Sequence, residues 1–180
     1  MKRVWLLATM LALLFGDEMK VCESEQDKMS GCVEMGYYAN GLPRFEMVFR
    51  DGKAEGWGTL YNKYGGIGAK ALFKNNKVEE TILYYGDGSI KSRFYYRDSV
   101  LEGVAKHYFP SGELRAETLY KNGKISGEEK WYSQKGDLIF SVIYRDDEPV
   151  SGKCANGKVL TSAHLYNIKR RVGSIDCWSF

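Results

Sequence analysis

Hydrophobic and polar positions alternate with a period of two in several short segments between residues 37 and 152. In one of these segments, the residues two, four, six and eight positions after Gly112 are Leu114, Ala116, Thr118 and Tyr120. The corresponding residues of two other segments are Ile90, Ser92, Phe94 and Tyr96, and Leu138, Phe140, Val142 and Tyr144. The position five residues after the glycine is charged or polar in each segment. This alternation predicts half-buried β-strands with a mostly apolar face and a mostly polar face.

The segments belong to a repeat of about 24 residues, each marked by an aromatic residue, a base, and then Asp or Asn. The five aromatic residues, which we expect to form the repeat core, are Phe49, Phe73, Tyr96, Tyr120 and Tyr144. A glycine stands eight residues before each aromatic residue, at Gly41, Gly65, Gly88, Gly112 and Gly136. A weaker sixth copy begins at Asn156-Gly157 and reaches Tyr166-Asn167.

Each repeat is predicted to contain two strands and two turns. In the fourth repeat, we expect strands at Val104–Phe109 and Leu114–Lys121. The dipeptides Asp51-Gly52 and Asn122-Gly123 favour the positive φ angles of tight hairpins, and Asn75-Asn76 is a weaker form of the same signal.

The predicted fold class is therefore all-β: an elongated antiparallel β-meander of about five 24-residue hairpin repeats with disulfide-stapled ends. No helix is expected outside the N-terminal segment. One column breaks the alternation, because the residue before each aromatic residue is itself apolar. It indicates either that both faces are partly covered there or that the second face carries an apolar stripe. Its members are Val48, Leu72, Tyr95, Leu119 and Ile143.

The N-terminus has the pattern of a secretory signal peptide. Two bases, Lys2 and Arg3, precede the apolar run Val4–Phe15, which is shorter than the ~20 residues of a membrane-spanning helix. We expect cleavage near residue 16 and export to the periplasm or cell surface of a bacterium. The predicted division is a signal peptide (1–16), an N-terminal cap (17–36), β-hairpin repeats (37–152) and a C-terminal cap with the degenerate repeat (153–180).

Four cysteines lie at the two ends of the chain, outside the repeats. An even number in an exported chain predicts disulfides, for which three connectivities are possible. Local pairing, Cys22 with Cys32 and Cys154 with Cys177, would staple each end. None of the four has the C-x-x-C spacing of a zinc site.

Composition and motifs give little support for catalysis or nucleic-acid binding. The 180 residues carry a net charge of +3, and two of the bases lie in the predicted signal peptide, so the remaining chain is nearly neutral. The two histidines, His107 and His164, are far apart in the sequence, and no common nucleophile, metalloprotease or phosphate-loop motif is present. We expect no enzymatic activity, no cofactor and no metal.

The base after each aromatic residue forms the candidate binding column. If each repeat adds two strands, neighbouring members lie roughly 10 Å apart, as in a ladder that could meet phosphates or an acidic partner. In the alternative interpretation, each base packs beside the aromatic residue and pairs with acids such as Asp51 and Asp98. The column consists of Arg50, Lys74, Arg97, Lys121 and Arg145. A second basic cluster, Asn167–Arg171, is expected to be a solvated loop.

The glycine and aromatic columns, as in residues 96–132, resemble MORN repeats of the variant type. More narrowly, they resemble bacterial proteins often labelled as antitoxins of toxin–antitoxin systems. The resemblance covers about residues 34–152, and implies a sequential β-hairpin sheet without catalytic activity or cofactor. Other MORN proteins are linked to membrane lipids and to scaffolding of partner proteins. The export signal and the terminal cysteines depart from the pattern of a cytosolic antitoxin.

These observations favour a non-enzymatic exported repeat module that binds another protein, as a scaffold or interaction partner. Exposed Tyr, Trp and Arg residues are typical of protein-binding surfaces. Two alternatives stay open: recognition of cell-wall glycan or anionic lipid by the aromatic and basic columns, and an antitoxin or immunity-type role.

Overall fold

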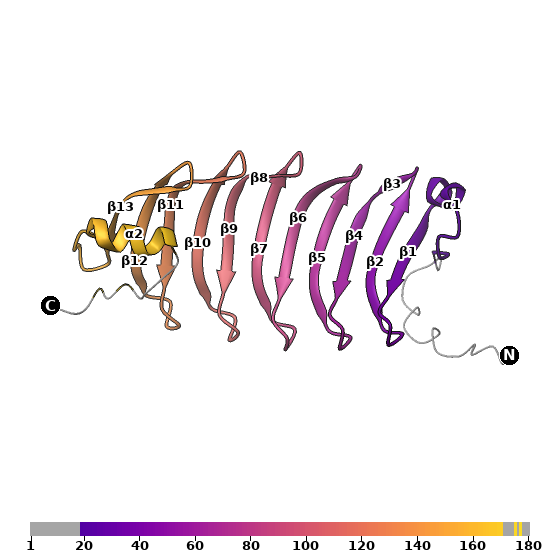
Figure 1. The fold of residues 1–180 in the computed structure, drawn as a ribbon, viewed down its shortest axis with the longest axis horizontal. Helices are drawn as coiled ribbons and strands as arrows, with labels where there is room; N and C mark the ends of the chain where they lie inside the picture. Colours follow the sequence, from indigo (N-terminus) through magenta and orange to yellow (C-terminus); the bar gives the residue numbers. More distant parts are fainter. Residues whose placement is uncertain (1–18, 171–174, 176, 178–180) are drawn as a thin grey trace.

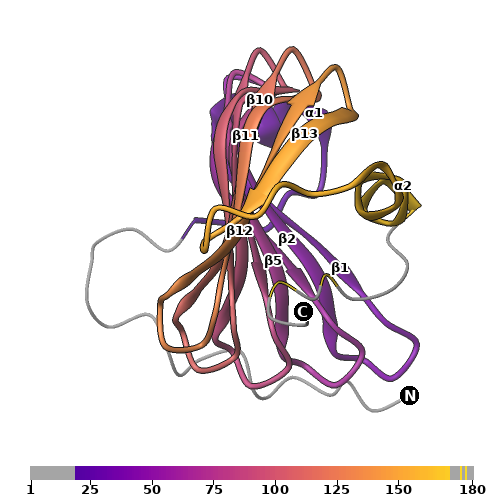
Figure 2. The same ribbon diagram turned by 90° about the vertical axis from the view of Figure 1, so that its left-hand side faces the viewer.

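The computed structural model describes residues 19–170, 175 and 177, and the predicted signal peptide lies outside these residues. The described chain forms an antiparallel sheet of 13 strands whose spatial order follows the sequence (Figure 1). This arrangement confirms the predicted elongated meander. Seen along its long axis, the sheet is strongly twisted, with the strand ends fanning out (Figure 2).

Eleven strands form the continuous path of the sheet, and each pairs with its neighbours along the chain. They are β1 (Cys32–Tyr37), β2 (Pro43–Arg50), β4 (Gly56–Tyr61), β5 (Ile67–Lys74), β6 (Lys77–Tyr84), β7 (Ile90–Arg97), β9 (Gly103–Tyr108), β10 (Leu114–Lys121), β11 (Lys124–Tyr132), β12 (Leu138–Arg145) and β13 (Glu148–Cys154). Two short strands extend the hairpins: β3 (Lys53–Ala54) pairs with β2, and β8 (Val100–Leu101) pairs with β7. The prediction of β10 is confirmed in full, whereas β9 begins and ends one residue earlier than expected.

Two-residue turns with positive φ at both positions join the strands at one end of each hairpin. Asn122 and Gly123 have φ angles of 49° and 81°, as a type I′ turn requires. The Asp or Asn of the recurring triplet is therefore the first turn residue, which explains why it recurs. The hairpin predictions are confirmed, and the other turns are Asp51-Gly52, Asn75-Asn76, Asp98-Ser99 and Asp146-Asp147.

The recurring glycine lies in the loop at the opposite end of each strand pair. Gly112 has a φ of 96°, and its N–H donates to the carbonyl of Phe109 at 2.9 Å. Gly157 of the sixth copy has the same geometry, with a φ of 86° and an N–H donated to Cys154. After this loop the chain pairs briefly with β13, where Val159 faces Lys153, and then forms a helix at Ser162–Arg170. The expectation that the sixth copy continues to residue 167 is therefore wrong.

A β-bulge in every repeat shifts the alternation that the sequence indicates. Leu114 pairs with Tyr108 and Ala116 pairs with His107, so Arg115 is the extra residue. Because His107 and Tyr108 are neighbours on a regular strand, Leu114 and Ala116 lie on opposite faces. The prediction that they share a face is wrong. The same correction applies to two residues at the equivalent position, Ile90 and Leu138.

The aromatic column lies on one face of the sheet, which we call the covered face. Tyr144 is buried, and the other four rings are half-buried. Each residue is paired across its hairpin with a mostly aliphatic partner, as Tyr120 is with Ile125. The remaining pairs are Phe49 with Ala54, Phe73 with Val78, Tyr96 with Leu101, and Tyr144 with Pro149.

Small residues between larger side chains allow a single sheet layer to bury part of this face. Ala105 and Ala116 are 2% and 1% exposed, although no second sheet formed by the described residues covers them. At Gly36 an added Cβ would come within 2.2 Å of the Phe45 ring, so the ring lies directly over the glycine backbone. The covered face is therefore a thin core built from cross-strand neighbours.

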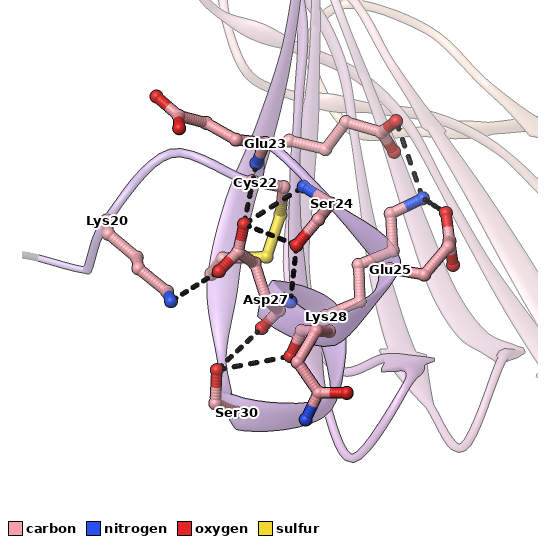
Figure 3. The surroundings of a disulfide bond; sticks show 11 residues. Lys20, Cys22, Glu23, Ser24, Glu25, Asp27, Lys28 and Ser30 are labelled. Carbon is pink, nitrogen blue, oxygen red and sulfur yellow. Dashed lines mark hydrogen bonds and ion pairs between the residues drawn. A yellow bond between two sulfur atoms is a disulfide. The ribbon is translucent and has the colours of Figure 1, made fainter.

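The N-terminal cap contains a helix that the sequence analysis did not expect, α1 (Glu25–Ser30). Ser24 and Asp27 form a capping box, and the Cys22–Cys32 disulfide ties the segment to β1 (Figure 3). The hydrogen bond from Lys20, followed by those from the Glu23 backbone and Ser24, holds the pKa of Asp27 far below its ordinary value.

Helix α1 packs on the covered face. Lys28 Nζ lies 4.7 Å from the centroid of the Phe49 ring and 3.6 Å from a Glu34 carboxylate oxygen, and both partners point to that face.

The C-terminal cap contains a second unexpected helix, α2 (Ser162–Arg170). It packs Leu165 and Ile168 against a cluster on the covered face. The buried members of this cluster are Val142, Tyr144, Cys154, Leu160 and Cys177. Residues 167–170 of the basic cluster lie in α2, so the expectation of a solvated loop is wrong there, and Arg171 lies outside the described residues.

Both predicted disulfides, Cys22–Cys32 and Cys154–Cys177, are confirmed. They fasten the two caps at opposite ends of the sheet (Figure 1). Disulfides of this kind indicate an oxidising compartment. None of the helices within the described residues is long and apolar enough to cross a membrane.

Candidate functional site: the open face of the sheet

Both helices pack against the covered face, so in the described part of the chain no element lies over the opposite face. We call this the open face. Cross-strand pairing brings residues from different repeats into three parallel rows across it. We name them the turn row, the apolar row and the central row, in order of increasing distance from the type I′ turns.

The turn row contains the predicted basic column. Its five members alternate with the aromatic residues along each strand, so they project from the open face, and all are exposed. Three further bases face them across the hairpins and belong to the same row: Lys53 opposite Arg50, Lys77 opposite Lys74, and Lys124 opposite Lys121. At three turns, the basic column therefore has two bases in place of one.

Acidic residues near the turns are engaged locally. Lys77 pairs with Asp98 of the next turn, and this contact is the main cause that lowers the pKa of Asp98. Glu102 accepts the N–H of Asn122 at 2.9 Å, and the equivalent Glu55 accepts that of Asn75. Asp98 lies at a turn tip, beyond the turn row. A shallow hollow of about 400 Å³ lies beside this turn, bordered by Lys74, Lys77 and Arg97 among other residues.

The apolar row lies two residues further along each strand. Trp57 faces Leu72, and Val104 faces Leu119. Trp57, Tyr95, Val104 and Ile143 are 41%, 39%, 40% and 40% exposed, respectively. The structure therefore favours the second of the two expectations for this column, an apolar stripe. Its apolar members are Val33, Val48, Trp57, Leu72, Tyr95, Val104, Leu119 and Ile143. Two carboxylates interrupt the row, Glu80 between Leu72 and Tyr95 and Glu128 beside Ile143, and Ser151 follows Ile143.

The central row lies another two residues along, and its charged members are mostly basic. Each residue faces the next across neighbouring strands from β2 to β13. In order, the row is Glu46, Thr59, Lys70, Ile82, Arg93, Lys106, Glu117, Lys130, Ser141 and Lys153.

Carboxylates on the central part of this face already have partners on the sheet. Arg93 pairs with Glu80 at 3.2 Å, and Lys130 pairs with Glu128 at 3.4 Å. Glu117 accepts a hydrogen bond from Tyr132 at 3.1 Å. Burial, and then this carboxylate, raise the pKa of Tyr132. The side chains of Arg93 and Lys130 are nevertheless 36% and 41% exposed, so they are accessible to a ligand.

The sequence analysis identified the turn row, part of the apolar row and, as the charged or polar position five residues after each glycine, half of the central row, but it missed the other half. It followed only the strands after each glycine, whereas Lys106, Lys130 and Lys153 belong to the strands before the loops. Their alignment depends on strand register, which joins residues from successive repeats. The same alternation of apolar and polar residues, followed along the strand before each loop as well, could have indicated these bases.

Neither histidine lies on the open face. His107 accepts or donates a hydrogen bond with Ser92 at 2.9 Å and makes an edge contact with Phe94, both on the covered face. His164 lies in the first turn of α2, where its N–H donates to Thr161. The described residues contain no group of three or more His, Cys, Asp or Glu side chains that could hold a metal ion.

Comparison with solved structures finds local similarity at low sequence identity. One match is a glycosylation-associated protein complex (Gap123) from Streptococcus agalactiae, with 17% identity and a TM-score of 0.40 over 57% of this chain and 19% of that one. Another is the accessory secretory protein 1, 2 and 3 structure from Streptococcus pneumoniae, with 13% identity and a TM-score of 0.28 over 77% of this chain and 23% of that one. The chain thus spans less than a quarter of either matched chain. No curated protein matches it.

The family comparison matches the MORN repeat variant at residues 101–122. This stretch runs from the end of β8 through β9 and β10 into the type I′ turn at Asn122-Gly123. The same turn, loop glycine and aromatic residue recur along the sheet on both sides of the match. Residues 101–122 are thus similar to a MORN repeat of the variant type, within a sheet built from recurring units of the same kind.

Proposed function

We propose that this protein is a non-enzymatic exported repeat module that binds another protein through its open face. The observation that carries the proposal is the apolar row, exposed between two basic rows on a sheet whose other face is covered. Exposed Trp and Tyr rings beside Arg side chains provide the residue types that dominate protein-binding hot spots.

The frame of the sheet supports a binding role. Caps fastened by disulfides lie at both ends, and main-chain N–H groups of Cys22 and Leu160 pair with the outer strands β1 and β13. Such pairing reduces the open sheet edge that would otherwise promote aggregation. The open face is then a regular surface that is accessible to a partner.

Export is the second part of the proposal. Two disulfides and the signal-like residues 1–16 support it together. Mass spectrometry of the native protein should show a chain that begins near Asp17. An intact Met1 on a cytosolic protein would contradict export and favour the antitoxin-type alternative.

The binding proposal is tested by affinity capture from a native cell-envelope extract, with the oxidised mature chain as bait. The open-face variant Val104→Ser/Leu119→Ser should lose the captured protein. The matched control, Tyr64→Ser, removes an exposed ring from a loop distant from the three rows and should retain it. Capture of a cell-wall fragment or a lipid in place of a protein would refute the proposal.

A further inference from the structure

We propose that the open face binds an acidic amphipathic helix of a partner protein, with its apolar side on the apolar row and its carboxylates on the two basic rows. This inference rests on the proposed protein-binding function and specifies the partner segment. The helix would lie across the strands, along the long axis of the sheet.

The spacing of the rows fits a helix. The turn row and the central row are four residues apart on each strand, which corresponds to about 13 Å. An α-helix with its side chains is about 10–12 Å wide. A helix lying on the apolar row therefore places the residues at its two flanks near the two basic rows. A single extended strand projects side chains to alternate faces, so it cannot contact all three rows in this way.

The length of the central surface defines the length of the helix. From Leu72 on β5 to Leu119 on β10, the apolar row crosses four strand spacings. At about 4.8 Å each, they span about 19 Å, or roughly 13 helical residues. Sheet twist turns the outer strands away from this line, so three to four helical turns are the longest contact expected of a straight helix.

Charge selects an acidic partner. Arg97, Lys121, Lys106 and Lys130 border the central part of the apolar row. The ion pairs of Lys106 with Glu117 and of Lys130 with Glu128 are partly exposed contacts that contribute little energy. Glu80, the carboxylate within this stretch of the row, is paired with Arg93. The same charges argue against a second copy of this chain, because face-to-face packing would bring basic rows together. An anionic membrane would engage the bases but would not require both rows and the intervening apolar row.

The test uses a synthetic 18-residue helical peptide with a Leu stripe, Glu on both flanks of the stripe, and Ala and Gln elsewhere. Binding to the oxidised mature chain is measured by fluorescence anisotropy at low and physiological salt. One control peptide carries Lys in place of Glu, and a second carries Ser in place of Leu. Vesicles containing phosphatidylglycerol are measured in parallel.

Each basic row is reversed separately. The double variant Arg97→Glu/Lys121→Glu reverses two charges of the turn row, and Lys106→Glu/Lys130→Glu reverses two charges of the central row. The matched control, Lys63→Glu/Lys135→Glu, reverses the charges of two lysines in the distant loops. Circular dichroism confirms that each variant is folded. Each row variant should bind the acidic peptide at least about tenfold more weakly, whereas the loop variant should bind it within about twofold of the original chain.

The proposal is confirmed by binding of the acidic peptide, loss of binding for both control peptides, and sensitivity to both rows. It is overturned if the acidic peptide does not bind, if only one row matters, or if vesicles bind and the peptide does not. A protein captured from the envelope extract whose binding ignores both row reversals would overturn this inference and leave the proposed function standing.

Discussion

Replacing Tyr144 by Ala should strongly destabilise the C-terminal part of the sheet. The Tyr144 side chain is 8% exposed and lies in the buried cluster with Val142, Cys154 and Leu160. It is the most buried member of the aromatic column, because only its repeat is covered by the C-terminal cap. The substitution would leave a cavity between β12 and that cap.

The size of the effect follows from the buried area. A tyrosine buries on the order of 200 Å², which at about 25 cal/mol per Å² corresponds to about 5 kcal/mol as an upper bound. Aromatic-to-Ala substitutions in cores cost about 3–5 kcal/mol, and we expect Tyr144→Ala to fall in this range. Tyr120 has the same place in its repeat but is only half-buried, so Tyr120→Ala should cost on the order of 2 kcal/mol.

The assay is equilibrium urea unfolding of the oxidised protein, followed by circular dichroism. Arg145→Ala is the matched control, because Arg145 adjoins Tyr144 on the exposed side of the strand and should contribute less than about 1 kcal/mol. The slope of the unfolding free energy with urea shows whether the variants unfold as the original chain does. If Tyr144→Ala and Arg145→Ala are equally stable, the aromatic column is not part of the core and the assignment of the two faces is wrong.

Three further perturbations test the caps and the loops. Replacing Cys154 and Cys177 by Ser should lower the free energy of unfolding by about 3 kcal/mol, and an unchanged melting temperature would contradict a stabilising role for this disulfide. Gly88→Ala should lower the free energy of unfolding in urea by about 1–2 kcal/mol, because φ is 87° at this position. Gly86 also has open space around it, so the control Gly86→Ala should change this free energy little. Equal effects of the two substitutions would contradict backbone strain as the cause. Because the folded-state pKa of Asp27 lies below its unfolded value, its stabilising contribution is present at neutral pH and lost as the pH falls below about 4. Asp27→Asn should therefore melt earlier than the original chain at pH 7, with the difference narrowing toward pH 2; a gap independent of pH would contradict this assignment.

The sequence by itself determined the fold class, the hairpin turns and the ends of the meander. These features depend on local rules that repeat along the chain. Asn122-Gly123 specifies a type I′ turn because both positions need positive φ, and the apolar alternation specifies a strand. The pairing of Cys22 with Cys32 also followed from their positions, since a sequential meander keeps the two ends of the chain apart.

The two helices were not predicted from the sequence, because short helices are specified by few residues. Helix α1 has a local signal that could have been used, the capping box formed by Ser24 and Asp27. Helix α2 is an amphipathic segment whose Leu165 and Ile168 find their partners only in the core of the C-terminal cap. A segment of nine residues is marginal as an isolated helix, so tertiary packing decides its structure.

Only the tertiary structure decided which side chains share a face. The bulge at Arg115 shifts Leu114 to the face opposite Ala116, and a single extra residue of this kind cannot be located from a pattern of period two. Strand register then places Glu117 between Lys106 and Lys130, although these residues come from successive hairpins. The candidate binding surface is therefore a product of register and bulges, whereas the sheet that carries it is encoded locally in each repeat.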